Sequence, residues 1–314
     1  MTAQAGQLPR KGRWSAAQRR ELAWGLLFLS PWIVGFIVFT AGPMLWSFYL
    51  SFTNYDPLVD TTDFLGLRNY ERVIDDRRIH QSLINTIFVA VLYVPGTILL
   101  GLLLAQLLNK VGRAAGFFRT AFYLPNMTPA VAVGALFLLL LNGQQGLVNE
   151  SIRAVGLPAP YWLEDGPWVK PGIILMLLWS IGGTVVIYFA ALRNVPVEQY
   201  EASRIDGASA WQQFWKITVP HISGAIFFTL IINTIAALQL FTEIYAMFFG
   251  NQQSGSAAAQ REALFYVVYL FQQAFQSFNM GYASAMAWLL FVVIVTITII
   301  QIRVSRRFVY YEGE

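Results

Sequence analysis

The chain has 314 residues, of which 56% are hydrophobic and only 12% are charged, and its formal net charge is +4. A soluble globular domain usually carries about a quarter charged residues, so this composition excludes a water-facing domain, a solenoid and a disordered chain. The sequence indicates an integral membrane protein, in which excess positive charge is more typical of cytoplasmic anchoring residues than of nucleic-acid binding.

Six apolar segments are long enough to cross a membrane, whose hydrocarbon core of about 30 Å takes about 20 helical residues. In chain order they are residues 22–50, 84–108, 120–141, 172–192, 222–243 and 282–302. Prolines interrupt the first three, at Pro31, Pro43, Pro95, Pro125 and Pro129. Prolines inside spans are tolerated where neighbouring helices or water satisfy the freed carbonyls. We therefore expect an all-α bundle of six transmembrane helices, some of them kinked, around a pathway.

One further uncharged stretch, residues 263–279, is interrupted by Gln272, Gln273, Gln276, Ser277 and Asn279. These polar side chains argue against a seventh span. We expect a helix that lies outside the membrane core or lines a cavity.

The basic residues predict the orientation, because they are enriched on the cytoplasmic side. With the N-terminus inside, 14 of the 21 basic residues but only 6 of the 17 acids fall on cytoplasmic segments. Residues 1–21 and 304–314 would then be cytoplasmic tails around a transmembrane domain at 22–303. The first apolar run is too long for the core of a signal peptide and no small-residue cleavage site follows it, so we expect a permanent span.

The loop at residues 193–221, between the fourth and fifth spans, has a distinctive pattern. Pro196 and Glu198 suit the first turn of a helix, and Gly207 permits the left-handed conformation that ends one. We therefore expect two short helices joined at this glycine. An apolar stripe follows at helical spacing, made of Trp211, Phe214, Trp215 and Ile217.

This pattern has two interpretations. The second helix could lie on the membrane with its aromatic rings among the headgroups. Alternatively the first helix, with Glu201, Ala202 and Ile205 close together, could enter a cleft on another protein.

The loop resembles the EAA loop of binding-protein-dependent ABC importer permeases, which reads Glu-Ala-Ala, three residues, Gly, nine residues and Ile-x-Leu-Pro. Glu201-Ala202-Ser203 supplies the core, Gly207 stands at the expected interval, and Ile217-Thr218-Val219-Pro220 closes the motif. Ser203 replaces the second alanine and Val219 replaces leucine, both conservatively.

Three other stretches resemble carbohydrate permeases of the maltose and oligosaccharide class, in the same topological order. They are Phe64-Leu65-Gly66-Leu67-Arg68-Asn69-Tyr70, Arg119 through Leu124-Pro125, and Gly281-Tyr282-Ala283-Ser284-Ala285. The resemblance covers nearly the whole chain. It implies the type I ABC importer permease fold, with both termini cytoplasmic, in the plasma (inner) membrane of a prokaryote.

The resemblance also implies the partners. No phosphate-binding G-x-x-x-x-G-K-[ST] run occurs, so we expect no cofactor on this chain and ATP-Mg on a dimeric cytoplasmic ATPase. A second homologous permease subunit, an extracytoplasmic sugar-binding protein and membrane lipid complete the expected assembly, without nucleic acid. The residues expected to couple to the ATPase are Tyr200, Glu201, Ala202, Ser203, Ile205, Asp206 and Gly207.

A sugar pathway is predicted from amide, hydroxyl and aromatic side chains in the spans, at positions that resemble the sugar site of maltose-type permeases. The candidates are Asn126, Trp179, Ser180, Gly182, Gly183, Asn233, Ala237 and Gln239. The alternative is ordinary hydrogen bonding between helices. Glu243 is a further candidate as an acid near a span interior, although its place at the outer end of the fifth span equally suits an interfacial carboxylate.

The sequence gives little support to other functions. The spans carry no basic residue to hold a phosphate, which favours a neutral saccharide over the alternative of a glycerol 3-phosphate-type permease. A stand-alone secondary transporter would need intramembrane ionisable residues, and apart from Glu243 the spans lack them. Without cysteine, with only two histidines, and without a G-x-S-x-G or H-E-x-x-H run, we expect neither catalytic residues nor metal ligands.

Overall fold

A computed structural model describes residues 15–59, 62–250 and 256–306 of the chain. Apart from an isolated bridge between Thr53 and Phe64, the regular structure of these residues is helical. The prediction of an all-α protein is therefore confirmed.

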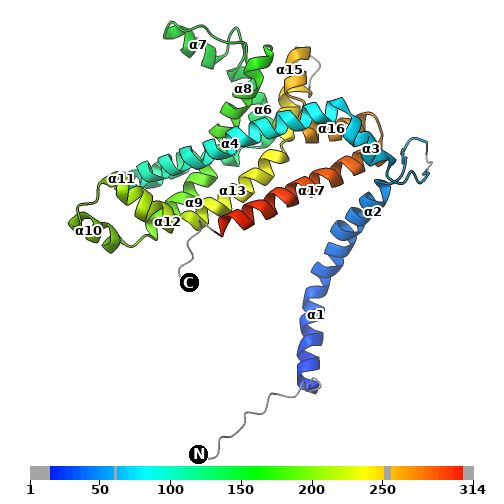
Figure 1. Ribbon diagram of the computed structural model, residues 1–314, viewed down its shortest axis with the longest axis horizontal. Coiled ribbons are helices and arrows are strands. Elements are labelled where there is room, and N and C mark those ends of the chain that lie inside the picture. The colour runs from blue at the N-terminus through cyan, green and yellow to red at the C-terminus, as the bar shows by residue number, and fades with distance from the viewer. Residues whose placement is uncertain (1–14, 60–61, 251–255, 307–314) are drawn as a thin grey trace, which may run out of the picture.

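Within these described residues, four helices are long and apolar enough to cross a membrane (Figure 1). The first is Ala16–Leu50, which consists of α1 (Ala16–Phe36), the π-helical turn η1 (Ile37–Ala41) and α2 (Gly42–Leu50). The second is α4 (Arg77–Lys110), the third joins α13 (Ser223–Leu238) to α14 (Thr242–Phe248), and the fourth is α17 (Met280–Ser305).

Two further candidate spans are bent pairs of helices, which bring the possible number of spans to six. The first pair is α5 (Ala115–Tyr123) with the 3-10 turn η3 (Leu124–Met127), followed by α6 (Ala130–Leu140), and it bends by 99°. The second pair, α8 (Gly166–Trp179) and α9 (Gly182–Arg193), bends by 48°. Pro125 opens η3 and Pro129 precedes α6, so the prolines predicted to kink this span instead break it into two helices.

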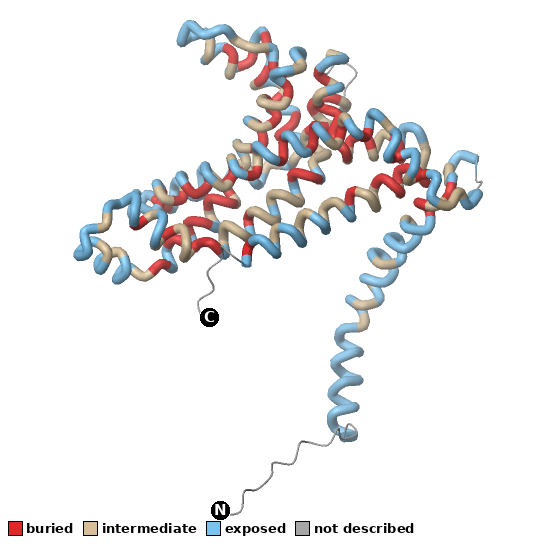
Figure 2. Tube along the Cα trace, in the orientation of Figure 1, coloured by how far each residue is buried: buried red, intermediate tan, exposed pale blue. Residues whose placement is uncertain are grey.

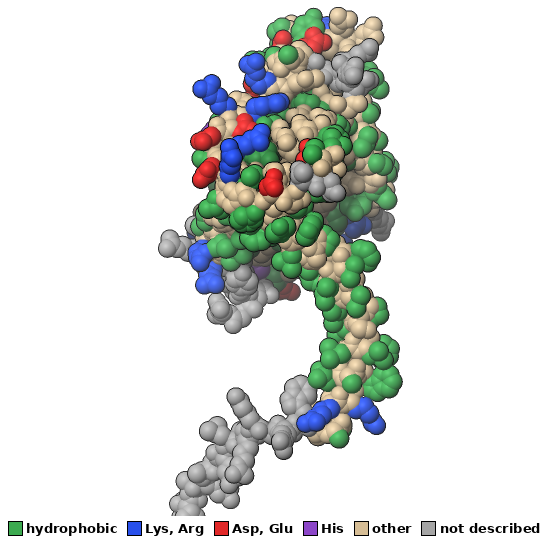
Figure 3. Space-filling view, turned by 90° about the vertical axis from the view of Figure 1, so that its right-hand side faces the viewer, with side chains coloured by type: hydrophobic (Ala, Val, Ile, Leu, Met, Phe, Trp, Pro, Cys, Tyr) green, Lys and Arg blue, Asp and Glu red, His purple; other side chains and the backbone are tan. Residues whose placement is uncertain are grey.

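The N-terminal helix Ala16–Leu50 forms an arm that projects from the bundle (Figure 1). No residue of α1 is buried, and the tube in Figure 2 is exposed along nearly the whole arm. Its helical ladder widens at η1, directly before Gly42-Pro43, because Pro43 has no N–H to donate to the preceding turn. In Figure 3 hydrophobic side chains cover the arm, and Lys and Arg side chains lie at its free end.

The bundle has two distinct ends. We call the end with α10 to α12, described below, the loop end. The opposite end, which we call the outer end after the orientation predicted from the sequence, carries the short helices α3 (Arg68–Asp75), α7 (Leu147–Ala154), α15 (Ala257–Glu262) and α16 (Tyr266–Phe271), with the π-helical turn η5 (Gln272–Gln276). A 3-10 turn, η2 (Gly112–Ala114), joins α4 to α5.

The stretch at residues 263–279 forms α16 and η5, which are too short to span a membrane. The glutamine pattern therefore gave the right prediction on this point. The stretch is nevertheless part of the packed interior, because Tyr266, Val268 and Tyr269 belong to the largest hydrophobic cluster of the described residues. At the beginning of this stretch, the side-chain amide of Asn85 on α4 donates to the carbonyls of Arg261 and Leu264 at 2.9 and 3.1 Å.

Candidate functional site

The first candidate site is the loop at residues 193–221. Pro196, with extended backbone angles, caps α10 (Val197–Ile205), and Glu198 lies in the first turn of this helix. Gly207 ends it with φ = +77°, and the N–H of Gly207 donates to the carbonyl of Arg204 at 3.1 Å. The chain then enters α11 (Ala210–Gln213), the π-helical turn η4 (Phe214–Thr218) and α12 (Val219–His221). The prediction of short helices joined at Gly207 is confirmed.

One face of α10 is fastened to the segment that follows it. Tyr200 Oη lies 2.8 Å from Thr218 Oγ1, and Gln213 Nε2 donates to Ser203 Oγ at 2.9 Å. The Tyr200 ring also packs on a hydrophobic cluster that contains Leu192. The serine that replaces alanine in the EAA pattern thus makes a hydrogen bond that alanine could not make.

The opposite face of α10 has no partner in the described part of this chain. Glu201 and Ala202 are exposed there, one turn before Ile205, whose side chain is 88% exposed. An isoleucine side chain this exposed is unfavourable in free energy unless a partner buries it, because its apolar surface remains in contact with water. The seven predicted coupling residues therefore divide into inward-facing Tyr200 and Ser203, outward-facing Glu201, Ala202 and Ile205, and the turn at Asp206 and Gly207.

The apolar stripe after Gly207 also divides. Phe214 and Ile217 pack against the same cluster as Tyr200. Trp211 and Trp215 remain 68% and 50% exposed, with ring centroids 5.6 Å apart. The regular helical spacing did not predict the π-helical turn that begins at Phe214.

The second candidate site is a partly open cavity of about 320 Å³ between the helices of the bundle. It lies where the breaks between helices meet: the η3 turn, the end of α8 and the gap between α13 and α14. Its polar lining comprises Tyr93, Asn126, Thr128, Ser180 and Glu243, and the remaining lining is Pro125, Ala130, Val133, Met176, Leu177, Ala236 and Leu240.

Asn126 and Ser180 are the two predicted pathway residues that the cavity brings together. Asn126 also connects η3 to the start of α9. Its side-chain nitrogen donates to the carbonyl of Ser180, and its side-chain oxygen accepts from the N–H of Gly183 at 2.9 Å. Gly182 and Gly183 permit this contact. A Cβ on Gly182 would lie 1.9 Å from the carbonyl oxygen of Phe122, and one on Gly183 would lie 2.7 Å from the Asn126 side-chain amide.

The other predicted pathway residues do not line this cavity. Trp179 packs edge-on against Phe137 at 5.7 Å, and Gln239 is exposed directly after α13. Asn233 donates to Thr184 Oγ1 at 3.4 Å, as the alternative of hydrogen bonding between helices anticipates. Ala237 is completely buried, in a cluster with Ala90 and Val94 of α4.

Glu243 lies in the first turn of α14, inside a candidate span that continues past the predicted end at residue 243 to Phe248. Ile244, Met247 and Phe248, which follow it, are buried. Tyr93 and Thr128 are cavity residues that sequence reasoning missed. Their positions beside Pro95 and Pro129 were the available signal, because prolines in spans mark places where helices open.

A polar cluster at the outer end centres on Asp76, which caps α4. Its carboxylate accepts from Tyr269 Oη at 2.7 Å, from Tyr282 Oη at 2.8 Å and from the N–H of Arg78 at 2.8 Å. Burial alone would raise the pKa of Asp76, but these hydrogen bonds favour the charged form and lower the pKa below its ordinary value. Burial and the bond to Asp76 raise the pKa of Tyr269 to about 12.

Broken apolar helices around a cavity with several polar residues, together with a short helix presented at one end, are typical of multi-pass membrane permeases. The chain belongs to the family of inner-membrane components of binding-protein-dependent transport systems, whose sequence profile matches residues 97–310. It is a transport component. The resemblance found in the sequence is thereby confirmed.

Relatives match over nearly the full length. The chain is 35% identical over 302 residues to the "Probable ABC transporter permease protein YesP" of Bacillus subtilis, covering 96% of each chain. It is 32% identical over 287 residues to the lactose transport system permease protein LacF of Rhizobium radiobacter, covering 90% of this chain and 94% of that one.

Among solved structures, the chain matches one from the bacterial alginate ABC transporter in complex with an alginate pentasaccharide-bound periplasmic protein. The TM-score is 0.78 at 24% identity, covering 92% of this chain and 95% of that chain. This likeness shows that the fold is that of an ABC importer permease.

Proposed function

We propose that the chain is the transmembrane permease subunit of an ATP-driven importer for a sugar or oligosaccharide in the inner membrane of a prokaryote, with both termini in the cytoplasm. Full-length similarity to a lactose permease supports the substrate class. The cavity supports it as well, since Tyr93, Asn126, Thr128 and Ser180 offer hydroxyl and amide groups of the kind that bind neutral sugars.

Coupling to a dimeric cytoplasmic ATPase rests on one observation: α10 is anchored by Tyr200 and Ser203 while Ile205 is 88% exposed. A partner groove would cover the isoleucine, and the Glu201 carboxylate would pair with a basic residue or cap a helix there. Closure of the ATPase around ATP-Mg would then move α10 and, through its bonds to Gln213 and Thr218, the bundle.

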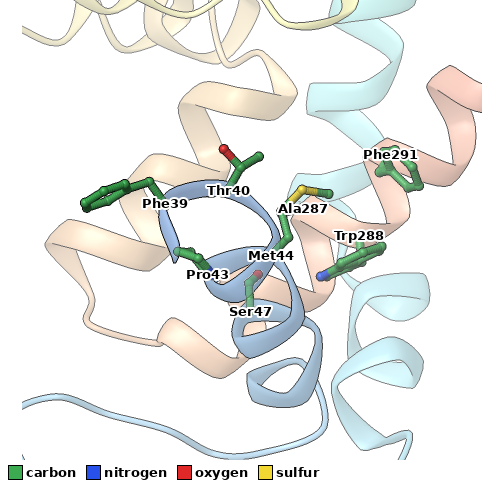
Figure 4. Close-up of a pocket in the computed structure, with 8 residues that line it drawn as sticks. All are labelled: Phe39, Thr40, Pro43, Met44, Ser47, Ala287, Trp288 and Phe291. Atoms are coloured by element: carbon green, nitrogen blue, oxygen red, sulfur yellow. The ribbon is translucent and has the colours of Figure 1, made fainter. Parts of the chain in front are cut away.

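A second permease subunit is supported by the arm. The apolar surface of α1 is uncovered in the described part of this chain. Further along the arm, a groove of about 390 Å³ lies between residues 39–47 and α17 (Figure 4). Met44 from the arm and Trp288 and Phe291 from α17 line this groove. An apolar helix of a homologous subunit fits such a surface. An extracytoplasmic sugar-binding protein would deliver cargo to the outer end.

Glycerol 3-phosphate is less well supported as a cargo, because no Lys or Arg lines the described cavity to hold a phosphate. A stand-alone secondary transporter is also less well supported. Glu243 is one acid in a candidate span, whereas ion coupling generally uses chains or pairs of such groups.

The experiment is purification of the tagged chain from native membranes, followed by reconstitution into liposomes and uptake assays with lactose and neutral oligosaccharides. We expect an ATPase, a second permease and a binding protein to co-purify, and uptake to require internal ATP. Recovery of the chain alone with ATP-independent uptake would overturn the proposal.

The coupling step is tested with Ile205→Asp, which places a charge in the proposed docking surface. We expect ATPase stimulation by the loaded binding protein to fall about tenfold or more, since burying an unpaired charge costs well over the 1.4 kcal/mol that this factor represents. Val155→Asp, at a side chain that is 72% exposed directly after α7, is the control and should leave stimulation unchanged. Wild-type stimulation in Ile205→Asp would refute docking through α10.

A further inference from the structure

The cavity between the broken helices has an acidic residue but no basic residue in its lining. Of the residues that line it, Glu243 is the single acid, and none is Lys, Arg or His. The hydroxyl and amide groups around it are neutral. Glu243 is therefore the one carboxyl group in this lining, with no basic side chain beside it there.

The position of Glu243 is fixed by its backbone. Gly134 of α6 lies so close that a Cβ there would be 2.9 Å from the Glu243 carbonyl oxygen, and the adjacent Ile244 is completely buried. Within the described part of the chain the ion pair is Lys170–Glu262, so Glu243 has no cation there to neutralise it. The Glu243 backbone is thus held by close packing directly after the interruption between α13 and α14, and its carboxyl group has no basic partner among the described residues.

We propose that Glu243 is a specificity-determining residue that restricts the cargo to saccharides without negative charge. A carboxylate accepts hydrogen bonds and donates none when ionised, so it can bind sugar hydroxyls. It repels the negative charge of uronates, sulfonates and phosphates that come within a few ångströms of it. This inference rests on the proposed function, because it assigns the cavity to the transport pathway.

The test uses the absence of native cysteine, which makes an introduced thiol the single target on this chain. Thr128→Cys places a reporter in the cavity, and Ser180→Cys is a second reporter in case the first fails to assemble. In the reconstituted complex, the thiol is modified by a cationic and an anionic methanethiosulfonate reagent of similar size. Mass spectrometry of this chain gives the two rates, which are compared with and without Glu243→Gln.

With Glu243 present we expect the cationic reagent to react faster than the anionic one, and Glu243→Gln to lower this preference about tenfold. Ser277→Cys at the exposed outer surface is the control thiol, and its preference should not change with Glu243→Gln. The same preference with and without Glu243→Gln would overturn the role of this residue. Lack of reaction at both cavity reporters, with and without vanadate-trapped nucleotide, would overturn the assignment of the cavity to an aqueous pathway.

These outcomes are independent of the uptake assay. A complex that fails to import saccharides but shows the charge preference contradicts the proposed function and leaves the electrostatic selection in place. A complex that imports saccharides without a Glu243-dependent preference contradicts this inference alone.

Discussion

The side-chain amide of Asn69 donates to the carbonyl of Thr53 at 2.8 Å, and it also donates to the carbonyl of Ser51 at 2.9 Å. These carbonyls lie directly after α2, where a helix end leaves acceptors without partners. Gly281, at the start of α17, approaches the same place, since a Cβ on it would lie 2.1 Å from the Thr53 carbonyl oxygen. Two sequence motifs more than 200 residues apart thus meet at the base of the N-terminal arm.

Asn69→Ala is expected to destabilise this joint. Asn69, Ser51 and Thr53 are all buried, so the substitution leaves two carbonyls without a donor, at a cost of about 1–3 kcal/mol each. Thermal unfolding of the purified complex should show a lowered midpoint. Asn109→Ala, at an exposed asparagine near the end of α4, is the control and should keep the wild-type midpoint.

Gly182→Ala is expected to disrupt the cavity wall. The added methyl group meets the Phe122 carbonyl oxygen at 1.9 Å, so α5 and α9 must separate, and overpacking of this kind costs about 1–3 kcal/mol. Gly224→Ala, in a helix with open space around it, should be neutral or slightly stabilising. If both variants unfold at the wild-type temperature, the close approach at Gly182 is not required.

Gly207→Ala tests the turn between α10 and α11. Gly207 and Gly156 share nearly the same left-handed angle, with φ of +77° and +79°, and a Cβ on either meets nothing within 4 Å. Alanine should therefore strain both positions by about 1–2 kcal/mol. We expect Gly207→Ala alone to reduce binding-protein-stimulated ATPase activity. An equal reduction in Gly156→Ala would show that general destabilisation is responsible.

Asp76 predicts an acid-sensitive outer end. Because its folded-state pKa lies below the ordinary 3.8, the ionised form stabilises the fold above that pH, and this contribution is lost as the pH falls through the lowered value. Unfolding midpoints measured between pH 3 and pH 7 should drop steeply below about pH 4. Asp76→Asn should flatten this drop, whereas Asp75→Asn, at an exposed neighbour, should keep it.

Hydropathy predicted the position of every candidate span, because about 20 apolar residues leave little choice in a membrane. It could not predict which spans break. Pro125 and Pro129 divide one helix by 99°, whereas Pro31 and Pro95 stay inside continuous helices. The difference depends on which neighbour supplies the missing hydrogen bonds, and this is a property of the packed bundle.

The site was predictable to a similar extent. The EAA pattern located α10, but its spacing did not reveal that Tyr200 faces inward and Ile205 outward. For the cavity, Asn126 and Ser180 were predicted correctly, whereas Gly182 and Gly183 are positions where the Phe122 backbone and the Asn126 side chain come close. The helix interruption at Gln239–Phe241, directly before Glu243, was not predicted because it contains neither proline nor glycine.

The arm has a mechanical consequence. It is a helix of 35 residues, which at 1.5 Å per residue is about 52 Å long, and its Leu50 end is held by the joint at Asn69 and Gly281. A tilt of about 10° at that joint would displace the far end by about 9 Å for a helix of this length. The arm is therefore a lever, through which a small rotation at the outer end becomes a large movement on the opposite side of the membrane.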